Sequence, residues 1–86
     1  MEKFNYTVTD ESGVHARPAG MIVAAAKKFS SKITVEFAEK KADAKKLFAL
    51  MQLGIRCGEE IVITADGEDE KTAISEIEAA IKKAGL

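Results

Sequence analysis

Three segments of the chain alternate apolar and polar residues with the period of a half-buried β-strand. Their apolar positions are Phe4, Tyr6 and Val8, then Ile33, Val35 and Phe37, then Ile61, Ile63 and Ala65. Residues 39–42 form a short polar segment that we expect to return as a further strand. Because alternation leaves one face of a sheet covered and the other wet, the pattern favours an antiparallel sheet with helices on one side only.

Two long segments and one short segment have helical periodicity instead. The apolar stripe of residues 16–29 consists of Ala19, Ile22, Val23, Ala26 and Phe29, and that of the last helix consists of Ala73, Ile74, Ile77, Ala80 and Ile81. Proline is tolerated only in the first turn of a helix, so Pro18 predicts that the first helix begins just after His15.

The short helix and the last helix have recognisable ends. Leu47, Leu50 and Met51 share one face of the short helix, and Phe48 lies off that stripe, so we expect Phe48 to point outward. Gly54 is a plausible stop for this helix. The last helix begins with the acidic residues 68–70 and ends with the basic residues 82–83, as the helix dipole favours, and Gly85 ends it.

The resulting order, β-α-β-β-α-β-α, predicts an α+β fold with helices packed on one side of a mainly antiparallel sheet. With 86 residues the chain has room for one domain, residues 1–86. A net charge of −1 gives no global reason to bind nucleic acid, and a single cysteine excludes an internal disulfide. The N-terminus is polar and no apolar run is long enough for a bilayer, so we expect a cytoplasmic protein without membrane insertion.

The segment SGVHARPA, residues 12–19, contains the only histidine of the chain. Gly13 permits a sharp turn after the first strand, which places His15 at or beside the N-terminal cap of the helix. Four backbone N–H groups lack partners at such an end and the dipole is positive, so phosphate binds there readily. A neutral imidazole can attack phosphorus, and the Arg17 guanidinium could bind the phosphoryl oxygens. This pattern points to phosphoryl transfer through His15.

The residue pattern leaves a second interpretation of His15 open. A single histidine beside a helix start is more commonly a cap or a surface residue, and Arg17 in a first turn is more commonly solvated. A metal site is disfavoured because no second histidine or cysteine ligand lies nearby.

The stretches SGVHARPAG, LFALMQLG and GEEIVITADGEDE resemble the HPr family of phosphocarrier proteins of the bacterial phosphoenolpyruvate:sugar phosphotransferase system. The resemblance runs from about Lys3 to the last residue. It implies an open-faced β-sandwich, in which a four-stranded antiparallel sheet carries three helices on one face.

The resemblance also implies roles for residues around His15. Enzyme I, phosphorylated by phosphoenolpyruvate, would pass the group to His15 Nδ1, and the A domain of a sugar-specific enzyme II would receive it. Arg17 would stabilise the phosphoryl group, Pro18 would fix the helix start, and Ser12 and Ala16 would support the active centre. Such a protein is a carrier with a transient phosphohistidine, works without a cofactor or metal, and is not an enzyme.

A partner surface and a missing regulatory site follow from the same resemblance. The positions that match the family's partner contacts are Gly20, Leu47, Phe48, Met51 and Gly54. Many Gram-positive members carry a regulatory serine where this chain has Lys46, which has no hydroxyl to phosphorylate. The resemblance therefore predicts a carrier without the kinase branch, and docking to two partners through one face predicts a monomer.

Two other functions are weighed against the carrier. Some relatives of this kind act only by binding a partner, but they lack the histidine or depend on the regulatory serine. A hydrolase that uses His15 as general base has only Asp10 and Glu11 as neighbouring carboxylates, and a domain this small rarely encloses a deep substrate cavity. The sequence leaves open which sugar, or which nitrogen-linked regulatory branch, a carrier would serve.

Overall fold

The computed structural model describes residues 1–86 and has the predicted order of strands and helices. The elements are β1 (Glu2–Thr7), α1 (Ala16–Ala26), β2 (Lys32–Phe37), β3 (Lys40–Asp43), α2 (Leu47–Met51), β4 (Glu60–Asp66) and α3 (Glu70–Lys83). The predicted fold class is confirmed: an open antiparallel sheet of four strands with three helices on one face.

The strands lie in the order β1-β4-β2-β3, and every neighbouring pair is antiparallel. β4 and β2 occupy the centre, and their register pairs Ile63 with Val35 and Ala65 with Ile33. These four side chains are almost fully buried. Because β1 and β4 are far apart in sequence, their pairing joins the beginning of the chain to its last strand.

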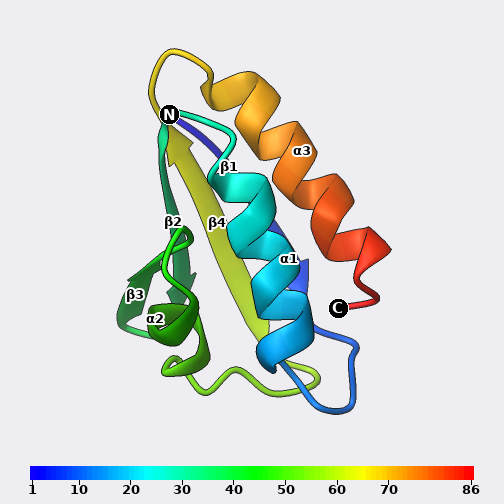
Figure 1. Ribbon diagram of the computed structural model, residues 1–86. Helices are drawn as coiled ribbons and strands as arrows, with labels where there is room; N and C mark the ends of the chain where they lie inside the picture. Colours follow the sequence, from blue (N-terminus) through cyan, green and yellow to red (C-terminus); the bar gives the residue numbers. More distant parts are fainter.

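The helices cover the apolar face of the sheet. Figure 1 shows α1 and α3 side by side across this face, with α2 near β3. Ile22 of α1, Ile77 and Ile81 of α3, and Ile61 and Ile63 of β4 are all buried in one continuous core. None of the helices combines the length and apolar character that a membrane span requires.

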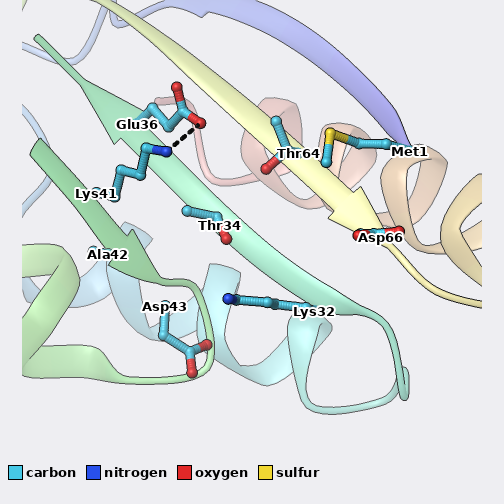
Figure 2. Close-up of a pocket in the computed structure, with 9 residues that line it drawn as sticks. All are labelled: Met1, Lys32, Thr34, Glu36, Lys41, Ala42, Asp43, Thr64 and Asp66. Atoms are coloured by element: carbon cyan, nitrogen blue, oxygen red, sulfur yellow. Dashed lines mark ion pairs between the residues drawn. The ribbon is translucent and has the colours of Figure 1, made fainter. Parts of the chain in front are cut away.

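The other face of the sheet is open and polar. Figure 2 shows Thr34, Thr64 and the ion pair between Lys41 Nζ and Glu36 Oε1, at 3.9 Å, along this face. The shallow hollow there is lined mostly by polar and charged side chains and contains none of the residues of the His15 segment. The predicted wet face is therefore present, on the side of the sheet opposite the helices.

The first helix ends earlier than the sequence predicts. α1 stops at Ala26, not Phe29, because the Phe29 N–H donates to the Ala26 carbonyl at 3.2 Å in a tighter turn. The predicted stripe is also imperfect, since Val23 is only half-buried and Ala25 is buried in its place.

Two further expectations need correction. α3 begins at Glu70 and not at residue 68, with Asp69 as its N-cap residue. The Asp69 side chain does not cap the helix, because its carboxylate accepts the N–H groups of Ser30 at 2.9 Å and Ser31 at 3.0 Å. β3 spans Lys40–Asp43, one residue later than predicted. In α2 Leu50 is buried, whereas Met51, expected on the partner surface, is 37% exposed.

Candidate functional site

The loop between β1 and α1 is a tight turn that is joined to the segment after α2. The Ser12 N–H donates to Asp10 Oδ1 at 2.8 Å, and the Gly13 N–H donates to the Asp10 carbonyl at 2.8 Å. Gly13 has a φ of +66°, where L side chains are strained, and it lies directly against the Ile55 backbone. The Val14 N–H then donates to the Ile55 carbonyl at 3.1 Å. These bonds define where α1 starts.

His15 is the N-cap residue of α1, as predicted. Of the first four N–H groups at this end, that of His15 donates to the Gly13 carbonyl at 3.1 Å, and Pro18 has none. The expected four free donors are thus reduced to two, those of Ala16 and Arg17, which have no partner within the protein. The His15 side chain does not cap them, so both remain available to an anion.

The His15 ring is partly exposed and is held through one nitrogen. Nε2 lies 3.2 Å from Asp10 Oδ2, and the side chains are 38% exposed for His15 and 18% exposed for Asp10. Nδ1 has no hydrogen-bond partner within the protein. The pKa of Asp10 lies below its ordinary value, first because the Ser12 N–H bonds the carboxylate and then because of His15 and Arg17.

Asp10 is a site residue that sequence patterns do not predict. A separation of five residues from His15 matches neither helical nor strand periodicity. The available signal is the pattern Asp-x-Ser-Gly, in which an aspartate caps a turn and can bend back towards the following helix.

The other predicted residues around the ring occupy different environments. Arg17 is exposed, and its guanidinium makes no hydrogen bond or ion pair. Ser12 is exposed and engages Asp10 through its backbone, not the ring through its hydroxyl. Pro18 is buried in the first turn of α1, and a Cβ added at Gly20 would meet nothing within 4 Å. The structure therefore places Arg17, Ala16 and Gly20 on accessible surface near the helix start.

An exposed apolar patch lies on α2, which packs against α1. We define the α2 surface by Leu47, Phe48, Met51 and Gly54. Phe48 is 76% exposed, which confirms that it points outward. Leu47 is half-buried, and Gly54 is exposed beyond the end of the helix with a φ of +68°. Exposed large apolar side chains close together commonly mark a docking site.

Comparison with known proteins agrees with this geometry. The family model described as the PTS HPr component phosphorylation site matches residues 2–83. The histidine-containing phosphocarrier protein of a Mycoplasma has 41% sequence identity and a TM-score of 0.94, covering 99% of this chain and 98% of its own. HPr from Thermoanaerobacter tengcongensis has 36% identity and a TM-score of 0.91, covering 99% and 96%. A dimer of HPr from the same organism has 36% identity and a TM-score of 0.78, covering 100% and 99%.

A shallow, accessible site on a one-core fold suits a protein that hands a group from one protein to another, and these matches define that class as a phosphocarrier. Such a protein is not a catalytic enzyme in its own right. The chain belongs to the HPr family of the phosphotransferase system.

Proposed function

We propose that His15 accepts a phosphoryl group on Nδ1 from phosphorylated enzyme I and passes it to the A domain of a sugar-specific enzyme II. The carrier would work in the cytoplasm and couple sugar uptake to sugar phosphorylation. One observation carries the proposal: Nδ1 has no partner within the protein and belongs to the N-cap residue of α1, which precedes the two unpaired N–H groups of Ala16 and Arg17.

The transfer step is balanced without any further reactant. The Nδ1 lone pair attacks phosphorus, the bond between phosphorus and the donor breaks, and its electron pair stays on the donor. The N–H groups of Ala16 and Arg17 and the Arg17 guanidinium stabilise the phosphoryl oxygens. Pro18 fixes the backbone angle in the first turn, and Ser12 holds the preceding loop through its bond to Asp10.

The α2 surface, together with Gly20 and Ala16 near the helix start, is the proposed docking face for both partners. Phe48, at 76% exposed, is the most exposed large apolar side chain of this face, and the open space above Gly20 leaves room for a partner close to His15. Because donor and acceptor would use the same face in turn, we propose that the carrier works as a monomer. Light scattering at working concentration tests this, since a relative is known as a dimer.

Lys46 occupies the N-cap of α2, the position that the family resemblance matches to the regulatory serine of many Gram-positive members. Lysine offers no hydroxyl, and its cation at a helix start is opposite in sign to a phosphoserine. We therefore propose that this carrier lacks the kinase-controlled branch. Incubation with a kinase that modifies HPr serines, with ATP, should add no phosphate, and phosphate found on α2 by mass spectrometry would contradict the proposal.

The central test uses enzyme I, phosphoenolpyruvate and the intact protein. Wild type should gain one acid-labile phosphoryl group by mass spectrometry, and His15→Ala should gain none. A wild-type protein that gains no phosphate would refute the proposed function.

A second test addresses the docking face through Phe48. Because Phe48 is 76% exposed, Phe48→Ala should change the free energy of unfolding by less than about 0.5 kcal/mol. Because the Phe48 ring would be a central apolar contact with the partner, Phe48→Ala should raise the KM for phosphorylated enzyme I about tenfold. The matched control is Lys71→Ala, exposed on α3. Equal KM values for the two variants would remove Phe48 from the interface.

A further inference from the structure

The Asp10 carboxylate is held in place independently of the histidine ring. Asp10 Oδ1 accepts the Ser12 N–H at 2.8 Å. The Asp10 backbone is held as well: its N–H donates to the Leu86 oxygen at 2.9 Å, and its carbonyl accepts the Gly13 N–H at 2.8 Å. With these three bonds made, Oδ2 is left facing His15 Nε2 at 3.2 Å. The side chain is only 18% exposed, so water covers little of this pair from the Asp10 side.

A carboxylate can only accept hydrogen bonds, so the nitrogen that faces it must carry the proton. The pKa of Asp10 is lowered, chiefly by the Ser12 N–H, which supports an ionised carboxylate at neutral pH. A neutral imidazole has one N–H, and if Nε2 carries it, Nδ1 keeps its lone pair. The contact therefore bears on which ring nitrogen is the nucleophile.

We propose that Asp10 is a positioning residue for phosphoryl transfer: it holds the proton on His15 Nε2, orients the ring, and leaves Nδ1 as the nucleophile. This inference rests on the proposed function of His15 and adds a residue to it.

The same contact acts on the phosphorylated state. When Nδ1 forms its bond to phosphorus, the ring still carries the Nε2 proton and becomes positively charged. The Asp10 anion beside that proton stabilises the charge, as a carboxylate behind a catalytic imidazole does in other transfer reactions. When an acceptor attacks phosphorus, the Nδ1–phosphorus bond breaks, its electron pair returns to Nδ1, and the proton stays on Nε2 throughout.

Two substitutions at Asp10 separate positioning from a merely structural role. Asp10→Ala removes both the cap on Ser12 and the acceptor for His15. Asp10→Asn can keep the cap on Ser12 through its amide oxygen, which turns its NH2 group towards Nε2. An NH2 group donates, so it favours the tautomer with the proton on Nδ1, which blocks the nucleophile. The matched control is Glu11→Gln, a neighbouring exposed carboxylate that makes no hydrogen bond or ion pair.

The first measurement reads the tautomer directly and needs no phosphorylation. Nitrogen-15 correlation spectra of the His15 ring, taken at alkaline pH where its chemical shifts no longer change with pH, distinguish a protonated from an unprotonated nitrogen. Wild type and Glu11→Gln should show the proton on Nε2. Asp10→Asn should shift the population towards Nδ1–H, and Asp10→Ala should give the mixture of an unrestrained ring.

The second measurement is the initial rate of phosphorylation by phosphorylated enzyme I. We expect Glu11→Gln to match wild type, Asp10→Ala to be about two- to fivefold slower, as suits one partly exposed charged contact, and Asp10→Asn to be slower still. A purely structural Asp10 would give the reverse order, because asparagine preserves the turn better than alanine does. An Asp10→Asn rate at or above that of Asp10→Ala, or a ring spectrum unchanged in both variants, would overturn the inference. If wild type takes up no phosphoryl group, the proposed function fails, and the ring spectra still decide whether Asp10 sets the tautomer.

Discussion

Gly13 offers the most direct test of how the site is held together. Its φ of +66° costs an L residue about 1–2 kcal/mol. An added Cβ would also strike the Ile55 carbonyl oxygen and lie 3.0 Å from Arg56 Cα. That carbonyl accepts the Val14 N–H. If the added Cβ pushes the two loop segments apart, the buried Val14 N–H loses its partner, at a further cost of about 1–3 kcal/mol. Gly13→Ala should therefore lower the free energy of unfolding by about 3 kcal/mol.

Gly54 provides the matched control, because its φ of +68° is nearly the same and a Cβ there would meet nothing within 4 Å. Gly54→Ala should lower the free energy of unfolding only through the strained backbone conformation. The net loss should be about 1 kcal/mol, because alanine also makes the unfolded chain less flexible. Urea unfolding followed by circular dichroism measures both variants, since the chain has no tryptophan to report by fluorescence. Equal losses of stability for the two variants would refute the claim that Gly13 is required by its contact with Ile55.

Two further predictions concern the hydrophobic core and the hydrogen bonds that join Asp69 to the turn before β2. Ile77 is fully buried, so Ile77→Ala should lower the free energy of unfolding, measured in urea, by about 2–5 kcal/mol. Ile74 is half-buried, so Ile74→Ala should lower it clearly less. Similar losses for the two variants would contradict the assigned core face of α3. Asp69 has a pKa lowered from 3.8, first by the Ser31 hydroxyl and then by the Ser30 N–H. Because the folded-state pKa is depressed, its stabilisation is full above pH 3.8 and disappears as the pH falls through the lower value. Asp69→Asn should flatten that part of the profile of stability against pH, and an unchanged acid limb would show that another group controls it.

Much of the site could be predicted because its determinants are local. Pro18 restricts where a helix can begin, so the position of His15 at the N-cap followed from the sequence and is confirmed. Phe48 lies off the apolar stripe of a short helix, so its exposure followed from periodicity. The HPr family was predicted from the segment around His15 together with the stretches LFALMQLG and GEEIVITADGEDE, and it is confirmed by the match over residues 2–83.

The failures occur where a residue bonds to a distant part of the chain. The acidic residues 68–70 were expected to begin α3, but the helix begins at Glu70, and the Asp69 carboxylate accepts donors from the turn before β2. Phe29 was expected to continue α1, but the chain must tighten there to enter β2. The free donors at the helix start were overcounted because Pro18 has no N–H and the His15 N–H bonds to the Gly13 carbonyl.

The sequence by itself determined which face of each strand is apolar, the order of the strands and helices along the chain, the start of α1 and the chemistry available at His15. All of these depend on residues within a turn or two of one another, where backbone geometry and side-chain period act directly. Only the tertiary structure decided the strand order β1-β4-β2-β3, the packing of Gly13 on Ile55 and the contact of Asp10 with His15. Strand pairing and the Ile55 contact join distant segments, and the direction of the Asp10 side chain depends on a loop held in place by Ile55 and Leu86, so no local pattern contains them.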